Sequence, residues 1–313
     1  MKIILLLLCI SLNSLATDAE EINKLEKWIM LDINDHQSAG LMLINAEADT
    51  AVLIVAGSGP TDHNGNITGM TNNSYKMLAT ELHQAGYSVL RFDKQGLGKS
   101  AYVEFDMSKT LFSAYVNDVV AWVEYLNKSH KHVVLIGHSL GGLLAMQAAK
   151  KEPVDRIITL ASVADSAYVT VKRQMQDQPE FVREAAVPLL DRLAQGETIP
   201  AAEVPVFLNA LLHPTIQPYL KSFMMIDPKT ELAQLNIPTL NIIGDTDIQI
   251  QVTETQRLSK DLKHVELKII SGMNHVLKNA PLDRNANLAT YSQAELPLHE
   301  ELIPVILQFL KNK

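Results

Sequence analysis

The chain lacks several features on which whole classes of protein depend. Its 313 residues include only one cysteine, and its 27 basic residues are outnumbered by 35 acidic ones, which gives a formal net charge of -8. A nucleic-acid binder usually shows a basic balance or a basic stripe, and neither occurs here. Hydrophobic residues make up 47% and charged residues 20% of the chain. These values are typical of a globular protein and exclude a disordered or collagen-like chain.

Long apolar runs are also scarce, and the one that stands out begins near the N-terminus. Residues 3–12 follow a lysine and lead into small residues that end at Ala16, an arrangement typical of a secretory signal cleaved before Thr17. We predict a signal peptide over residues 1–16 and a secreted or periplasmic protein. No stable membrane anchor would remain after cleavage, because no second run reaches the roughly 18 residues of a membrane span. The lone Cys9 would leave with the signal, so the mature chain needs neither disulfides nor a thiol nucleophile. A buried N-terminal strand or helix is the alternative.

Short apolar, strand-like runs alternate with helical patterns along the rest of the chain, which indicates an α/β sheet with crossover connections. The first two runs look like an antiparallel hairpin, and most later ones are almost continuously apolar, as in parallel strands buried on both faces. We predict a mostly parallel eight-stranded sheet flanked by helices. The expected strands are 28–33, 40–45, 51–56, 88–92, 133–137, 156–161, 239–243 and 265–270. The expected helices are 75–85, 114–127, 140–150, 253–262 and 300–310.

One stretch interrupts this alternation. Residues 164–235 show no strand pattern but contain helical stretches and seven of the chain's 13 prolines. We interpret this stretch as a helical insertion into one core domain, which residues 17–163 and 236–313 form together. The alternative is a separate C-terminal domain that starts near residue 164, but too few strands follow to build one.

The strongest functional signal lies at residues 133–142, which read V-V-L-I-G-H-S-L-G-G. An apolar strand ends in Gly-x-Ser-x-Gly and a helix begins at once, which is the pattern of a nucleophile elbow. Side chains at Gly137 or Gly141 would collide with neighbouring elements, and the helix N-terminus would favour an oxyanion beside Ser139. We predict Ser139 as a catalytic nucleophile. The alternative is an ordinary strand-to-helix turn in which the serine only caps the helix.

A serine nucleophile needs a base, and the base needs an acid that fixes its tautomer. His275 follows the expected strand 265–270 across a short loop, so it should lie at the carboxyl edge of the sheet, where catalytic loops gather. Two aspartates follow the expected strand 239–243. We choose Asp247 as the acid, because it lies past the turn and can reach the histidine loop. Asp245 is the runner-up, since aspartate is also a common turn residue.

An oxyanion hole requires two backbone N–H donors. The elbow supplies one of them from Leu140. The loop at residues 56–65, A-G-S-G-P-T-D-H-N-G, follows the third expected strand, and its glycines let the backbone approach a substrate closely. We assign the second donor to Ser58 and expect Asp62 and Asn64 to brace the loop. A plain glycine-rich turn is the alternative.

Two other patterns suggest a bound cofactor or metal, and we reject both. The run Gly96-x-Gly98-x-x-Ala101 matches part of a dinucleotide fingerprint, but three residues separate its first glycine from the strand, whereas the fingerprint starts in the tight turn itself. The pair His130-x-His132 has no carboxylate or third histidine near in sequence to complete a metal site. We therefore predict neither a cofactor nor a metal.

Together these motifs resemble the α/β-hydrolase superfamily, and the resemblance covers essentially the whole mature chain. It rests on the elbow, on the chain order Ser139, Asp247, His275, and on the run D-x-x-G-x-G-x-S at residues 93–100. The segments I-P-T-L-x-I-x-G-x-x-D and G-x-x-H, which end at the acid and at the base, are similar to the acid strand and the histidine loop of that family.

The run G-S-G-P-x-D at residues 57–62 resembles a narrower group, the secreted or periplasmic bacterial serine esterases of the serine-aminopeptidase-like (S33-like) branch. In those relatives an arginine often follows the aspartate, where this chain has His63. The resemblance implies that residues 164–235 form a lid whose apolar side chains line the acyl or alcohol pocket, although core packing would explain each of them equally well. The side chains concerned are Leu211, Leu212, Phe223, Met224 and Met225.

Three functions remain open at this point. The first is a serine carboxylesterase that cleaves small-molecule esters of small or medium acyl chains through an acyl-enzyme on Ser139. The second is an aminopeptidase-like serine peptidase with the same triad, which would need a lid carboxylate to hold the substrate's ammonium group. The candidates for that group are Asp165, Asp177, Glu180, Glu184, Asp191, Glu197 and Glu203. The third is a non-catalytic binding protein on a hydrolase scaffold.

Overall fold

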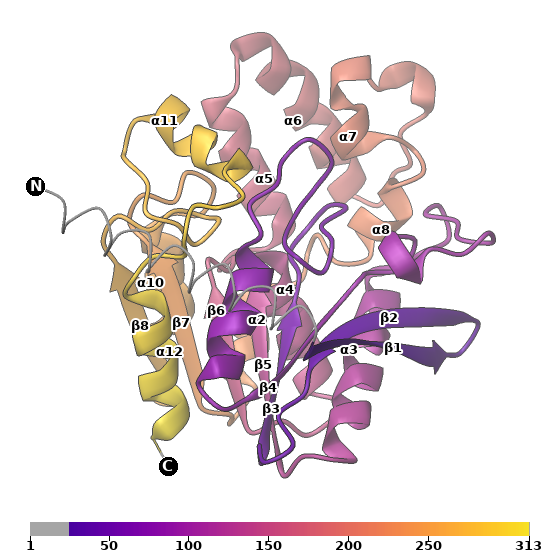
Figure 1. Ribbon diagram of the computed structural model, residues 1–313. Helices are drawn as coiled ribbons and strands as arrows, with labels where there is room; N and C mark the ends of the chain where they lie inside the picture. Colours follow the sequence, from indigo (N-terminus) through magenta and orange to yellow (C-terminus); the bar gives the residue numbers. More distant parts are fainter. Residues whose placement is uncertain (1–24, 313) are drawn as a thin grey trace, which may run out of the picture.

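The computed structural model describes residues 25–312, so the predicted signal peptide at residues 1–16 lies outside the described residues. One eight-stranded sheet runs through the molecule in the order β1-β2-β4-β3-β5-β6-β7-β8 (Figure 1). The strands are β1 (Glu26–Ile33), β2 (His36–Leu43), β3 (Thr50–Val55), β4 (Ser88–Phe92), β5 (His132–His138), β6 (Arg156–Leu160), β7 (Thr239–Gly244) and β8 (Val265–Ile270). All eight predicted strands are present, and their bounds differ from the prediction by a few residues at most.

Strand direction divides the sheet into two parts. The hairpin β1–β2 is antiparallel and adds to β4 in antiparallel register, whereas β4, β3, β5, β6, β7 and β8 are parallel to one another. The central strands are buried on both faces because their side chains are apolar on both. On β3, Leu53 and Val55 face one hydrophobic cluster, while Val52 and Ile54 face the other.

Helices cover both faces of the sheet (Figure 1). On one face lie α3 (Phe112–Asn127) and α4 (Leu140–Ala149), with Trp122 and Leu144 among the side chains buried there. On the other face lie α2 (Ser74–Gln84) and α12 (Leu302–Lys311), with Leu78 and Phe309 buried against the strands. The remaining helices of the core are α10 (Val252–Ser259) and α11 (Arg284–Ala289), with the short 3₁₀ helices η1 (Gly98–Ser100) and η5 (Thr290–Ser292). The prediction of a mostly parallel sheet flanked by helices is confirmed.

The stretch from 164 to 235 is helical and contains no strand, as its sequence predicts. It joins β6 to β7, which pair directly in the sheet, so the chain leaves the sheet after β6 and returns to the neighbouring position. The segment has an apolar cluster of its own, to which Leu190, Leu193 and Leu212 belong. Its helices are α5 (Ala167–Gln174), η2 (Met175–Asp177), α6 (Glu180–Ala194), η3 (Ala201–Glu203), η4 (Val206–Leu208), α7 (Asn209–Leu212), α8 (Gln217–Lys221) and α9 (Pro228–Ala233). None of the helices in the described part of the chain is long and apolar enough to cross a membrane.

Candidate active site

Ser139 occupies the sharp turn between β5 and α4. Its backbone has φ 53° and ψ -124°, a conformation that costs a non-glycine residue free energy and persists only where the surroundings enforce it. Hydrogen bonds enforce it here. The Ser139 N–H donates to the carbonyl of Leu160 at 2.8 Å, and the Ser139 carbonyl accepts from the hydroxyl of Ser162 at 2.9 Å. The neighbouring strand β6 and the residues that follow it therefore hold the serine in its strained turn.

The flanking glycines are required by the close approach of backbone to backbone. A Cβ atom at Gly137 would overlap the Gly141 carbonyl, and one at Gly141 would overlap the carbonyl of Val55 on β3. These are the collisions expected from the sequence pattern, and neither neighbour is a flexible side chain that can move aside.

Asp247 and His275 form a hydrogen-bonded pair beside this turn. The imidazole Nδ1 lies 2.8 Å from one carboxylate oxygen of Asp247, and both side chains are almost fully buried. The other carboxylate oxygen accepts from the N–H groups of Gln249 at 2.7 Å and Ile250 at 3.0 Å. The aspartate can act on the imidazole only as an acceptor, so Nδ1 carries the proton and Nε2 remains available as a base.

Asp245, the alternative acid, is engaged elsewhere. Its carboxylate accepts from the Ser271 hydroxyl at 2.9 Å and from the Gly272 N–H at 2.7 Å, and thereby fixes the start of the histidine loop. The structure thus brings Asp247, and not Asp245, against His275.

Ser139 and His275 line the same cavity. Within residues 25–312, no hydrogen bond joins the Ser139 hydroxyl to the imidazole. Catalytic hydrogen bonds are often long in unliganded sites and tighten when substrate binds.

His138, next to the serine, has a structural role. Its Nε2 lies 2.7 Å from the backbone carbonyl of His275, and its Nδ1 lies 2.8 Å from the Tyr75 hydroxyl. Burial lowers the pKa of His138 to about 3, so the ring is neutral. Nε2 must then be the donor, and Nδ1 accepts from Tyr75, whose oxygen in turn accepts the Gly57 N–H at 3.3 Å. This chain of hydrogen bonds connects the histidine loop to the loop after β3.

The two predicted oxyanion donors lie near the serine. Leu140 is the first residue of α4, and Ser58 lines the cavity together with Ser139. Neither N–H group has an acceptor within the part of the chain that the structure describes. Both are therefore free to donate to a ligand.

The loop after β3 is braced as predicted. One carboxylate oxygen of Asp62 accepts from the N–H groups of Asn64 and Asn66, at 2.8 and 2.9 Å. The Arg91 Nε donates to the side-chain oxygen of Asn64 at 3.2 Å.

His63 contacts a carboxylate in a neighbouring loop. Its Nδ1 lies 2.7 Å from a carboxylate oxygen of Asp93, in the loop after β4. Burial would raise the pKa of Asp93, but hydrogen bonds from His63 and from the Lys99 N–H outweigh burial and lower it. His63 therefore ties the loop after β3 to the loop after β4.

Comparison with known proteins agrees with this geometry. The serine aminopeptidase S33 family model matches residues 68–209. Esterase EstD of Thermotoga maritima is 26% identical over 242 residues, which cover 72% of this chain and 54% of that protein. Phospholipase YtpA of Bacillus subtilis is 28% identical over 132 residues, covering 42% of this chain and 47% of the relative. The matches thus span about half the length of these two curated relatives. A solved Pyrococcus furiosus esterase superposes with a TM-score of 0.58 at 19% identity, covering 91% of this chain and 90% of that one.

The chain has the α/β-hydrolase fold. The order of strands, the elbow after β5 and the position of the histidine loop after β8 all follow that fold. Relatives named as a proline iminopeptidase and as haloperoxidases also match, so the resemblance alone does not select the reaction.

The cavity that contains Ser139 and His275 has a volume of about 260 Å³. Its apolar wall comes from Ile67, Met70 and Val276, and Gln249 and Tyr291 add polar groups. Among residues 25–312, no aspartate or glutamate lines it.

The expectation that five apolar residues of the 164–235 segment line the pocket is wrong. Leu212 and Met224 are buried in the apolar cluster of that segment, with Leu211 packed against it. Phe223 is buried against the core of the sheet, and Met225 is exposed to solvent. Apolar spacing alone could not distinguish these packing roles from a pocket wall.

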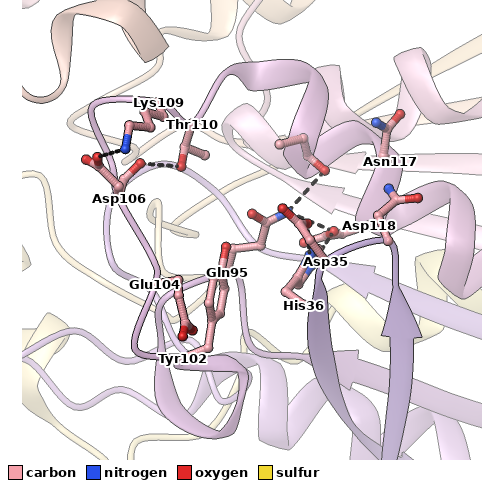
Figure 2. Close-up of a pocket in the computed structure, with 12 residues that line it drawn as sticks. Asp35, His36, Gln95, Tyr102, Glu104, Asp106, Lys109, Thr110, Asn117 and Asp118 are labelled. Atoms are coloured by element: carbon pink, nitrogen blue, oxygen red, sulfur yellow. Dashed lines mark hydrogen bonds and ion pairs between the residues drawn. The ribbon is translucent and has the colours of Figure 1, made fainter.

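A larger cavity, of about 460 Å³, lies between the β1–β2 turn and the start of α3. Figure 2 shows His36, Gln95 and Asp118 pointing toward one another there; one Asp118 oxygen lies 3.1 Å from the His36 Nε2 and 2.9 Å from the Gln95 amide nitrogen. Burial raises the pKa of Asp118, and the hydrogen bond that His36 makes to Asp118 raises the pKa of His36. None of the predicted catalytic residues lines this cavity. Its polar network ties the β1–β2 turn to α3.

Sequence reasoning missed Tyr75 and Lys94, both of which hold the loop after β3. Tyr75 reaches that loop through the Gly57 N–H, and Lys94 reaches it through two carbonyls. A lysine two residues after an apolar strand was the available signal for Lys94. No local pattern marks Tyr75. No group of three or more metal-binding side chains occurs among residues 25–312.

Proposed function

We propose that this α/β-hydrolase is a serine carboxylesterase that acts on small, uncharged acyl esters. The observation that carries the proposal is the Asp247–His275 pair beside a strained Ser139. Ser58 lines the same cavity as Ser139 and His275, Leu140 directly follows the serine, and neither backbone N–H has an acceptor among residues 25–312. This combination supplies a nucleophile, an oriented base and an oxyanion hole, which are the parts that acyl transfer requires.

The reaction proceeds in two steps. In the first, the Ser139 oxygen bonds to the acyl carbon while its proton passes to the Nε2 of His275. The oxyanion that forms accepts from the N–H groups of Ser58 and Leu140. The tetrahedral adduct collapses as His275 returns the proton to the leaving alcohol. In the second step, water gives a proton to His275 and attacks the acyl-enzyme, and the acid is released as Ser139 regains its proton.

The cavity argues for a short acyl chain without charge. Its volume of about 260 Å³ is below the roughly 300–1,000 Å³ of pockets for drug-sized ligands. Ile67, Met70 and Val276 offer an apolar wall for a few methylene groups.

The same cavity argues against an aminopeptidase, since none of the described residues that line it is a carboxylate that would hold an ammonium group. Several lid carboxylates are already paired: Asp165 with Arg257, Asp191 with Lys172, and both Glu197 and Glu203 with Arg192.

A direct test compares two substrate series on the purified protein. We expect turnover of p-nitrophenyl acetate and butyrate, falling steeply for decanoate and dodecanoate, and little cleavage of aminoacyl p-nitroanilides. The Ser139→Ala variant is the control and should lose ester turnover by several orders of magnitude. Preferential cleavage of the anilides would instead indicate a peptidase. Absence of turnover on both series, equal to that of the variant, would indicate a binding protein.

A further inference from the structure

Lys94 lies directly behind the loop that carries the Ser58 N–H. It follows β4, it is only 8% exposed, and it does not line the cavity. Its Nζ donates to the carbonyl of Gly57 at 2.7 Å and also to the carbonyl of Gly59. The lysine therefore holds the backbone on both sides of Ser58 by hydrogen bonds.

No carboxylate compensates this buried amine within residues 25–312; both of its hydrogen-bond partners are backbone carbonyls. Burial lowers the pKa of Lys94 to about 7. A buried amine without an ion-pair partner is costly. Burial of this amine lowers the stability of the folded protein, and its two hydrogen bonds must offset that loss. Both hydrogen bonds go to the loop after β3.

The geometry of the peptide bond connects these contacts to the oxyanion hole. In a trans peptide the C=O and the following N–H lie in one plane and point in opposite directions, and the described chain has no cis peptide. When Lys94 holds the Gly57 carbonyl on one side, the Ser58 N–H must point to the other. The Gly57 N–H is fixed as well, on the hydroxyl of Tyr75 at 3.3 Å.

We propose that Lys94 is a positioning residue that holds the Ser58 N–H in the orientation required to receive the oxyanion. The inference rests on the proposed esterase function, since it assigns a role within that reaction. Lys94 contacts neither the cavity nor the reacting atoms, and it acts only through the Gly57–Ser58 peptide.

A positioning role for an oxyanion donor has a specific kinetic signature. The donor contributes more to the transition state than to substrate binding, so its misorientation lowers kcat and leaves KM nearly unchanged. A merely structural lysine would instead alter stability, or kcat and KM together.

The test substitutes Lys94→Met, which keeps the length of the side chain but removes its donors. We expect kcat for p-nitrophenyl butyrate to fall about ten- to a hundredfold, and KM to stay within about threefold of the wild-type value. This decrease in kcat is smaller than the one expected when an oxyanion donor is removed altogether. Lys94→Gln keeps N–H donors on a shorter side chain, so its kcat should lie between those of Lys94→Met and the wild type. The matched control is Lys99→Met, because Lys99 lies in the same loop, is exposed, and places its Nζ over the Trp28 ring at 4.4 Å; it should keep wild-type kinetics.

A pair of inhibitors separates positioning from structure. A butyl trifluoromethyl ketone is attacked by the serine and forms a hemiketal oxyanion, whereas the matching methyl ketone binds mainly in its ground state. The Ki of the first should rise by the same factor by which kcat/KM falls, and the Ki of the second should stay within about twofold. Equal changes for both ketones, or no change in kcat, would overturn the inference. If Lys94→Met does not fold, the same comparison on Lys94→Gln decides. If Ser139→Ala retains the turnover of the wild type, the proposed function itself is contradicted. If the wild type is active through Ser139 and the Lys94 variant is equally active, only the inference about Lys94 is contradicted.

Discussion

Burial sets the charge state of single residues around Ser139. His138 has its pKa lowered to about 3 and Lys94 to about 7, while burial raises the pKa of Tyr75. A neutral His138 can donate to the His275 carbonyl and accept from Tyr75 at the same time, which a protonated ring could not do. The orientation of the histidine loop therefore depends on the absence of a charge.

A pH prediction follows for His138. Its folded-state pKa lies below its usual value, so below about pH 6.5 the unfolded chain takes up a proton that the folded protein does not. Stability contributed by the neutral ring is full above that pH and is lost as the pH falls toward 3. We expect the unfolding free energy of the wild type, relative to His138→Gln, to fall by about 1.4 kcal/mol per pH unit between pH 6 and pH 4. Urea unfolding of both proteins measures this difference, and parallel curves would show that the ring is not held neutral.

The two aspartates after β7 provide a matched pair of variants. Asp247→Asn keeps the shape of the side chain but removes the acceptor that fixes the His275 tautomer, so we expect kcat to fall by about three to four orders of magnitude. Asp245→Asn changes only the support of the loop at Ser271 and Gly272, and should cost less than about tenfold. Ester hydrolysis under saturating substrate gives both values. A larger loss for Asp245→Asn would reverse the assignment of the acid.

At the scale of elements, the sequence-based prediction and the structure agree where the secondary structure of a segment follows from its own residues. The run at 133–142 predicts both the strand and the helix around Ser139, because apolar continuity marks a buried strand and the glycines permit the sharp turn. The eight strands follow from the same kind of local pattern.

Contacts between elements were less accessible to sequence reasoning. Lys94 holds the carbonyls of Gly57 and Gly59, and Tyr75 holds the Gly57 N–H. These bonds go to backbone atoms, which every residue carries, so no side-chain pattern marks them. The apolar residues near 211–225 show the converse case: their composition suits a pocket wall, but the 164–235 segment uses most of them in packing.

This correction yields a prediction about two elements. Leu212→Ala removes a fully buried side chain of the 164–235 segment and should lower the unfolding free energy by about 2–5 kcal/mol without a change in acyl-chain preference. Met70→Ala shortens a side chain that lines the cavity and thereby enlarges the cavity. This variant should turn over longer acyl chains at little cost in stability. Chemical denaturation and an acyl-length series on both variants test this. A shift in the acyl-chain preference of Leu212→Ala would indicate that the 164–235 segment does shape the pocket.

At the scale of the whole molecule, we propose that the protein is exported and that residues 1–16 are removed in the process. The proposal rests on the apolar run at 3–12 and the small residues before Thr17. Expression of the full chain in a bacterial host should give a mature protein in the periplasm or medium whose first residue is Thr17. N-terminal peptide mapping by mass spectrometry identifies that residue. An uncut chain that stays in the cytoplasm would contradict the export proposal without affecting the catalytic one.

The whole molecule also explains how three distant residues meet. Parallel strands place the ends of β5, β7 and β8 at one edge of the sheet, and the loops that follow them carry Ser139, Asp247 and His275. Ser139 precedes both other residues by more than a hundred positions, yet the fold places Ser139 and His275 in one cavity, with Asp247 hydrogen-bonded to His275.

The most direct measurement of the central claim is covalent labelling by a fluorophosphonate, followed by peptide mapping. A phosphonylating probe reacts only with a serine that is activated by a base and faces an oxyanion hole. We expect a single label on the peptide that contains Ser139, its loss in Ser139→Ala, and strongly slowed labelling in a His275→Ala variant. Labelling of another serine, or equal labelling of the Ser139→Ala variant, would contradict the assignment of Ser139 as the nucleophile.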